Sequence, residues 1–182
     1  MNSYMKVFSI LLAVLLLYLY PIYTAFQQQD DLSELVAMKA TTTFVDSVRD
    51  KGYISPTMYN DFVDALSVTG LVFDVQMQHE SKKYVPVYTD VTRPETFQNR
   101  YELHTDNFYH TQIMATLFPE QSVRKDDPLR RYQLKIGDTF AVTVANKSRT
   151  PGTVMFDFIN NAVSASEKIV IPYGGVVRNE VD

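Results

Sequence analysis

The first fifty residues carry two hydrophobic patterns in succession, and both are typical of a helix. Residues 7–26 form an uncharged, mostly apolar run. A stripe follows in which every fourth residue is hydrophobic: Leu32, Val36, Ala40, Phe44 and Val48. This spacing places the stripe on one side of a helix, and the charged residues between, including Asp30, on other faces. We expect one helix from about residue 5 to 51, ended by Gly52.

A second helix and a strand come next. Ser55 followed by Pro56 is typical of a helix start, with serine as the cap and proline in the first turn. The apolar positions predict that this helix continues to about Gly70. Residues 71–78 then alternate between apolar and polar side chains, which predicts a half-buried strand.

The middle of the chain has weaker periodicity. Residues 84–88 predict an edge strand, because Pro86 has no N–H to donate to a neighbouring strand. Residues 92–101 show no clear period. Asp106 predicts the cap of a helix over residues 107–118, and residues 119–131 predict a loop.

The last third of the chain is rich in strand patterns. Residues 132–136 and 139–145 alternate, and residues 154–162 predict a short amphipathic helix. Residues 169–171 predict a buried strand. The segment 172–175, Pro-Tyr-Gly-Gly, predicts a turn before a final strand.

These elements predict an α+β protein. We expect a long N-terminal helix, comprising a transmembrane part and a stalk, followed by a small head with an antiparallel sheet of about four strands. Three parts are expected: residues 1–29 as a cytoplasmic tip and transmembrane helix, residues 30–52 as an amphipathic stalk helix, and residues 53–182 as an extracytoplasmic α+β head.

The apolar run is long enough to cross a bilayer, whose hydrocarbon core needs roughly 20 helical residues. Lys6 precedes the run, whereas Asp30, Asp31 and Glu34 follow it. Because positive charge favours the cytoplasmic side, we expect a single-pass protein of the cell membrane with a cytoplasmic N-terminus and an extracellular C-terminal domain.

A cleaved signal peptide is the alternative interpretation of this run. The best cleavage candidate is the segment 23–25, Tyr-Thr-Ala, where a bulky tyrosine stands at a position that favours small residues. The run is also longer than a usual signal core. Both observations favour a retained anchor, and both interpretations place the domain outside the cytoplasm.

Composition narrows the class of partner. The net charge is −4, and residues 30–182 carry −5 because Lys6 is the one charged side chain among residues 1–29. A nucleic-acid-binding protein needs a clustered basic surface, so we expect no nucleic acid partner. The chain contains no cysteine, which excludes disulfides and thiolate metal sites.

Candidate chemistry is sparse. The histidines, His79, His104 and His110, match no zinc-ligand spacing, and we interpret them as ordinary polar residues near strand or helix ends. Asp61 and Asp64 predict a solvated helix face rather than an acid–base pair. Nucleophile elbows, Walker loops and calcium loops are absent from the sequence. We therefore expect no catalytic residue, no metal, no cofactor and no enzymatic activity.

Aromatic residues are abundant, at 13% of the chain. Most of them follow the core-facing periodicity, so core packing is the simpler explanation. Tyr84, Tyr88 and Tyr101 do not follow it. They are candidates for an exposed aromatic patch that binds a partner or a sugar.

The layout resembles pilin-like or pseudopilin-like proteins, in which an apolar helix continues as an amphipathic stalk into a small α+β head. The segments 43–55, TFVDSVRDKGYIS, and 171–175, IPYGG, are similar to TadE-type, membrane-anchored pilus-assembly proteins of Gram-positive bacteria. True prepilins have a glycine before the apolar helix and usually a glutamate just inside it. Here no glycine precedes Gly52 and no acid precedes Asp30, which favours an uncleaved accessory component.

The first functional hypothesis is a structural or accessory component of a type IV or Tad-like pilus or secretion assembly. Its partners are the lipid bilayer and other membrane or pilus-assembly proteins, and the stalk stripe Leu32, Val36, Ala40, Phe44 and Val48 is the expected binding face. The alternative is an exported, membrane-tethered ligand-binding or adhesion module that uses the tyrosine patch. An anchored hydrolase is the third hypothesis, and it lacks a nucleophile constellation.

Overall fold

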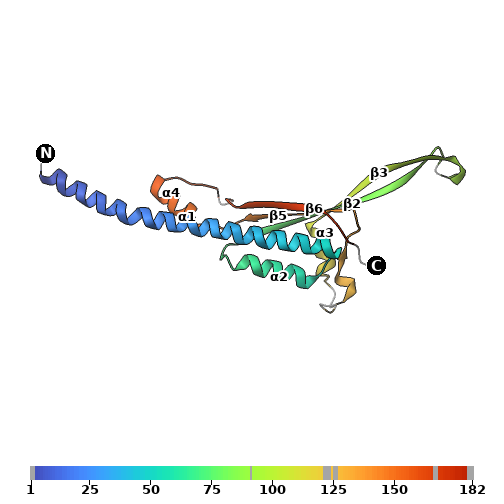
Figure 1. Cartoon of the computed structure of the whole chain (residues 1–182), viewed down its shortest axis with the longest axis horizontal. Helices are drawn as coiled ribbons and strands as arrows, with labels where there is room; N and C mark the ends of the chain where they lie inside the picture. Colours follow the sequence, from blue (N-terminus) through green and yellow to red (C-terminus); the bar gives the residue numbers. More distant parts are fainter. Residues whose placement is uncertain (1–2, 91, 121–123, 125–126, 166–167, 180–182) are drawn as a thin grey trace.

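The computed structural model describes residues 3–90, 92–120, 124, 127–165 and 168–179. Figure 1 shows an elongated molecule built along one long helix. The elements, in chain order, are α1 (Ser3–Lys51), β1 (Tyr53–Ile54), α2 (Pro56–Ser67), β2 (Phe73–Tyr88), η1 (Pro94–Thr96), β3 (Phe97–Tyr109), α3 (His110–Leu117), η2 (Pro128–Arg130), β4 (Tyr132–Gln133), β5 (Thr139–Asn146), α4 (Pro151–Asn160) and β6 (Val170–Val176).

The long helix α1 confirms the prediction of one helix through the apolar run and the stalk. It has 49 residues and continues through Pro21. It ends at Lys51, and the next residue, Gly52, has a φ of 72° that is easily reached only without a side chain. The amide of Gly52 donates to the carbonyl of Val48 at 2.8 Å, which closes the last turn.

The head confirms the predicted α+β class. Four antiparallel strands form the main sheet in the order β3-β2-β5-β6, and β1 pairs with β4 in a second, two-stranded sheet. Strand β2 pairs with β5 from Phe73 to Glu80 and with β3 from Gln78 onward, so it has a neighbour on both sides over residues 78–80. Beyond Glu80 it pairs with β3 alone, so the two strands continue as a hairpin that projects away from the head (Figure 1).

The core lies between α1, α2 and one face of the sheet. Alternate residues of β5, Phe140, Val142 and Val144, are buried in the same hydrophobic cluster as Val45 and Val48 of α1. The residues between them on β5 face away from the core and are half-buried or exposed. The period-2 pattern predicted for this strand is therefore confirmed.

The buried face of α1 differs from the predicted stripe. Phe44 and Val48 are buried as expected, but Leu32 and Val36 are exposed and Ala40 is half-buried. The side chains that α1 buries ahead of Phe44 are small or polar: Asp30, Ser33, Ala37 and Thr41. Small side chains let α1 approach its neighbours closely, and the hydroxyls of Ser33 and Thr41 donate to carbonyls of their own helix. Asp30 lies on a different face from Leu32 and Val36, as expected, but its carboxylate is buried and has hydrogen-bond partners in the head.

The strands expected over 71–78 and 84–88 are parts of one strand, β2, and Pro86 lies where β2 pairs with β3 alone, which agrees with the predicted edge position. The prediction for Asp106 was wrong. Asp106 does not cap a helix, because it lies in β3 opposite Ser81. The helix α3 begins only at His110, with Tyr109 as its cap.

The C-terminal turn was also predicted wrongly. Residues 170–176 form the single strand β6 at the edge of the sheet, where Pro172 is tolerated. The glycines serve close packing instead of a turn. A Cβ at Gly174 would lie 2.7 Å from the Cβ of Ala141 on the neighbouring strand.

The remaining differences concern element ends. Of the predicted strand 132–136, only Tyr132–Gln133 forms β4. The helix predicted from residue 154 begins earlier, as α4 at Pro151, with the Thr150 hydroxyl accepting from the Thr153 amide. Part of the predicted loop 119–131, residues 121–123 and 125–126, lies outside the described residues.

Candidate functional site

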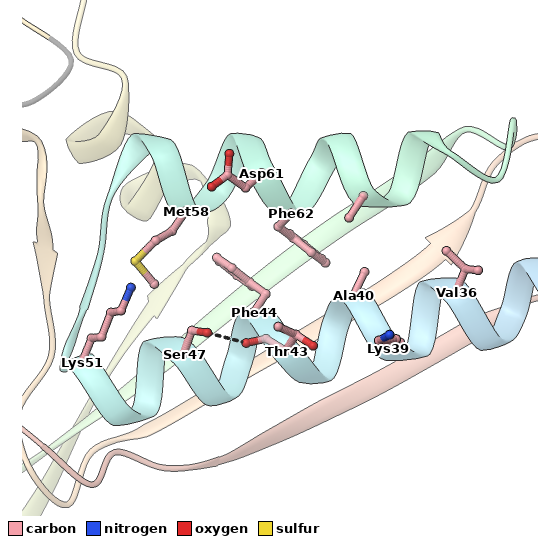
Figure 2. Close-up of a pocket in the computed structure, with 11 residues that line it drawn as sticks. Val36, Lys39, Ala40, Thr43, Phe44, Ser47, Lys51, Met58, Asp61 and Phe62 are labelled. Atoms are coloured by element: carbon pink, nitrogen blue, oxygen red, sulfur yellow. Dashed lines mark hydrogen bonds between the residues drawn. The ribbon is translucent and has the colours of Figure 1, made fainter.

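The strongest candidate is a groove between α1 and α2. The positive φ of Gly52 turns the chain, and Ser55 then caps α2 by accepting a hydrogen bond from the Met58 amide at 3.2 Å. Helix α2 runs back along α1, so the two helices lie side by side (Figure 2). The groove between them has a volume of about 400 Å³.

The floor of the groove is apolar. Phe44 of α1 stacks on Phe62 of α2, with ring centroids 4.5 Å apart and planes 5° apart. Tyr59 and Phe140 meet the edges of the Phe44 ring, at 6.5 and 6.2 Å. Figure 2 shows Phe44, Phe62 and Met58 in the space between the helices. The apolar lining residues are Val36, Ala40, Phe44, Met58, Phe62 and Ala65.

Charged side chains surround this apolar strip. Lys39 and Lys51 of α1 and Asp61 of α2 also line the groove, and all three are exposed. Asp64 is exposed on α2 as well, which agrees with the prediction of a solvated helix face. An apolar strip with a charged rim fits the apolar face of an amphipathic helix, which docks by burying residues spaced three and four apart.

The structure divides the predicted stalk face into three parts. Val36, Ala40 and Phe44 line the groove, and Val48 is buried in the core. Leu32 is 62% exposed one turn before Val36, so the stripe extends the groove along α1 toward the apolar run. The α2 half of the groove was missed, because sequence periodicity does not show which helices pack together.

The predicted tyrosine patch is assembled on the projecting hairpin. Tyr84 pairs with Leu103, and Pro86 with Tyr101, so these four side chains share one face of the β2–β3 ribbon. Tyr84 is 73% exposed and Tyr101 60% exposed.

Phe97 joins the remaining tyrosine to this patch. Its ring lies 5.6 Å from Tyr88 and 5.4 Å from Tyr101, and Tyr88 is half-buried by the contact. Phe97 and Leu103 were missed from sequence, since residues 92–101 have no clear period. The register of the hairpin was the missing information.

His79 departs from the expected role of an ordinary polar residue. It is buried, with Nδ1 at 2.7 Å from the Tyr132 hydroxyl and Nε2 at 2.9 Å from the carboxylate of Asp138. Burial raises the pKa of Tyr132, and the charge of Asp138 raises it further.

Asp138 joins β2 to the turn before β5. Burial acts to raise the pKa of Asp138. Hydrogen bonds from the Lys135 amide, His79 and the Lys82 amide outweigh burial, so the pKa lies below its ordinary value. The carboxylate is thus engaged in structural hydrogen bonds. The cluster holds two strands together. Among the described residues, the hydrogen-bond partners of the His79 ring are Tyr132 and Asp138, and neither is a serine or threonine nucleophile.

The other histidines are separate from this cluster. His104 is exposed on β3, with Nε2 3.1 Å from Asp106. His110 begins α3, and its burial lowers its pKa although the charge of Asp74 opposes the shift. Within the described part of the chain, no three histidine or carboxylate side chains converge as metal ligands do.

The N-terminal half of α1 is the second candidate surface, because it exposes a long apolar stretch. Its most apolar stretch is long enough to cross a membrane and has no buried residue in the described structure. A secretion signal near an N-terminus can also satisfy these criteria of helix length and hydropathy. The structure is thus compatible with a membrane anchor.

Comparison of this chain with protein families, with curated proteins and with solved structures finds no match.

Proposed function

We propose that this protein is a membrane-anchored, pilin-like structural or accessory component of a type IV or Tad-like pilus or secretion assembly. One observation carries the proposal. A single uninterrupted helix provides an exposed apolar half and then becomes the spine of an α+β head. Because one helix belongs to both the anchor and the head, it fixes the position of the head relative to the membrane, which suits a structural role.

A retained anchor is part of the proposal. Ile22, Tyr23 and Phe26 are half-buried, and Tyr23 and Phe26 line hollows shared with α4. Cleavage after Ala25 would remove Tyr23 from this contact and would begin α1 at Phe26. These contacts support a helix that stays attached. Lys6 before the apolar run and the acids after it favour a cytoplasmic N-terminus and a head outside the cell.

The α1–α2 groove is the proposed docking site for a helix of another membrane or pilus-assembly protein. The groove continues into the exposed Val36 and Leu32, so a partner helix could lie along the stalk for several turns. Within the membrane the association is expected to be weak. Close packing of membrane helices favours small residues, and the apolar run offers Ser9, Ala13 and Ala25.

In-cell photocrosslinking tests the proposal. A photoreactive residue at Val36 reports on the groove, one at Ala13 reports on the anchor, and one at Val68, which is exposed outside the groove, is the control. We expect discrete protein crosslinks from Val36 and Ala13 to components of one assembly, and none from Val68. Crosslinks to lipid alone from both positions would contradict the proposal.

A binding or adhesion module is the second candidate function, and the hairpin favours it. Tyr84, Tyr101 and Leu103 are exposed together at the end of the molecule remote from the apolar run (Figure 1). The double variant Tyr84→Ser/Tyr101→Ser tests this function through adhesion of protein-bearing vesicles to cells and glycan surfaces. Loss of adhesion with unchanged Val36 crosslinks would favour the second function, whereas lost crosslinks with unchanged adhesion would favour the first.

A further inference from the structure

Helix α4 exposes an unusual amount of apolar surface. Phe158 is 77% exposed, and Val163, just beyond the helix, is 95% exposed. Val154, Phe156 and Ile159 add further exposed apolar area on the same short helix. Monomeric soluble proteins rarely leave so many large apolar side chains together in water, so we expect this surface to be covered by a binding partner or by lipid.

The N-terminal end of α4 is fixed to α1 by a buried carboxylate. Asp30 accepts hydrogen bonds from the Thr150 hydroxyl at 2.6 Å and the Gly152 amide at 3.2 Å, and Nζ of Lys168 lies 2.9 Å from it. A Cβ at Gly152 would lie 2.3 Å from the Asp30 carboxylate, so the glycine is needed for this approach. The start of α4 therefore lies at the level of residue 30.

From that point α4 runs back toward the N-terminus of α1 (Figure 1). Phe156 lines a hollow with Tyr23, and Phe158 lines another with Phe26. On α1 four of the half-buried residues of this region have the spacing of one helix face, Leu19, Ile22, Tyr23 and Phe26, and Thr24 is half-buried beside them. All four belong to the apolar run of residues 7–26, so α4 covers the outer end of the segment that crosses the membrane.

We propose that α4 and the segment 161–164 lie in the interface of the outer leaflet, as a second membrane contact beside the transmembrane helix. The occupant of the apolar surface is the lipid itself, and the inference rests on the proposed function as a retained anchor. A helix packed on the last turns of a transmembrane segment cannot avoid the headgroup region. Its exposed phenylalanine and aliphatic side chains match those of interfacial helices.

The cations near α4 fit the same placement. Lys168 and Arg149 bind Asp30 and Asp157, and each remains about two-fifths exposed. Both lie at the head side of α4, where lipid phosphates would be found. The head is thereby held at a fixed height and rotation on the membrane surface.

Fluorescence quenching in vesicles tests this placement. The natural chain has no cysteine, so each single-cysteine variant carries one environment-sensitive label. Full-length Phe158→Cys and Val163→Cys are reconstituted in phosphatidylcholine–phosphatidylglycerol vesicles with brominated acyl chains. Leu16→Cys is the control inside the membrane, and Tyr84→Cys on the projecting hairpin is the control outside it.

We expect quenching by brominated lipid at Phe158 and Val163 to exceed that at Tyr84 by about fivefold and to approach that at Leu16. Quenching at Leu16 without quenching at the α4 positions would overturn the inference and leave the anchor intact. Absence of quenching at Leu16 would overturn the anchor and the inference together. Protection of both α4 positions from lipid and from aqueous iodide would indicate a second copy of the chain on this surface, and would also overturn the inference.

A substitution at a second position checks that lipid contact depends on the α4 surface. Phe158→Asp is introduced into the labelled Val163→Cys protein, with Val68→Asp as the matched control because Val68 is exposed elsewhere on the head. Quenching at Val163 should fall at least about twofold with Phe158→Asp and stay unchanged with Val68→Asp. Equal quenching in both proteins would overturn the proposed role of Phe158.

Discussion

Gly175 of β6 lies directly beneath the guanidinium group of Arg49 in α1. A Cβ at this glycine would lie 2.6 Å from Cζ of Arg49. The arginine is held there by its hydrogen bonds to the Val176 carbonyl at 3.0 Å and to Asp46 at 2.7 Å. The fold thus brings together the segments 43–55 and 171–175, on which the proposed resemblance to pilus-assembly proteins is based.

Gly175→Ala should destabilise the head. The added methyl group must displace Arg49 and weaken its hydrogen bonds, which is expected to cost about 1–2 kcal/mol of the free energy of unfolding. Chemical denaturation of the full chain in detergent measures the change. In the Arg49→Ala background the same glycine substitution should cost less than about 0.5 kcal/mol. Equal costs in both backgrounds would show that the two residues are not coupled.

Phe44→Asp should destabilise the protein by several kcal/mol, because an unpaired carboxylate would replace a buried ring. Leu32→Asp is the matched control three turns earlier on the same helix, where the side chain is exposed. It should leave the melting temperature nearly unchanged. If the two variants melt alike, α1 does not pack on the head as described.

Asp30→Ala should loosen α4 from α1. The substitution removes the buried acceptor of the Thr150 hydroxyl and the Gly152 amide, which is expected to cost about 2 kcal/mol. Hydrogen exchange should increase first in the amides of α4. Asp31→Ala removes the same charge from an exposed neighbouring position and should have no such effect.

His110 should make stability depend on pH. Its pKa in the folded protein lies below the ordinary value of about 6.5, because burial disfavours the charged ring. The unfolded chain therefore binds the proton more readily, so this contribution to stability is complete above pH 6.5 and is lost as the pH falls toward the folded pKa. Unfolding free energies measured from about pH 7.5 to 5.5 should decline.

The control separates His110 from the other histidines. His110→Asn should reduce the slope over this range, whereas His104→Asn, on an exposed part of β3, should not. An unchanged slope in the His110 variant would assign the pH dependence to another group.

The retained anchor predicts the mass of the native protein. Protein extracted from membranes should have a mass that includes residues 7–26, and protease added to intact, wall-stripped cells should digest the head. A mature chain that begins near Phe26 would indicate signal-peptide cleavage.

Local patterns predicted the regular elements well because their signals are contained within a few residues. The four-residue spacing and Gly52 defined α1, Ser55 and Pro56 marked the start of α2, and the alternation along residues 139–145 defined β5. Each of these depends on a helix face, a cap or a strand pleat, and needs no knowledge of distant neighbours.

Contacts between distant segments explain what was missed. Asp30 is buried because Thr150, Gly152 and Lys168 surround it, and none of these lies near it in the sequence. The segment 172–175 has turn-like composition, but pairing with β5 keeps it extended. Part of the groove was predicted through Val36, Ala40 and Phe44, whereas its second wall depends on how α2 packs.

Because α1 is one continuous helix, tilting its N-terminal half also moves the half that packs in the head. A helix of 49 residues is about 74 Å long, since each residue adds 1.5 Å. Because the same rod passes from the apolar run into the head, any tilt of one part is an equal tilt of the other. At the average transmembrane tilt of about 20°, the far end of such a rod moves about 25 Å sideways. The interfacial contacts that set the tilt of the apolar run, among them the proposed α4 contact, would thereby set where the head points.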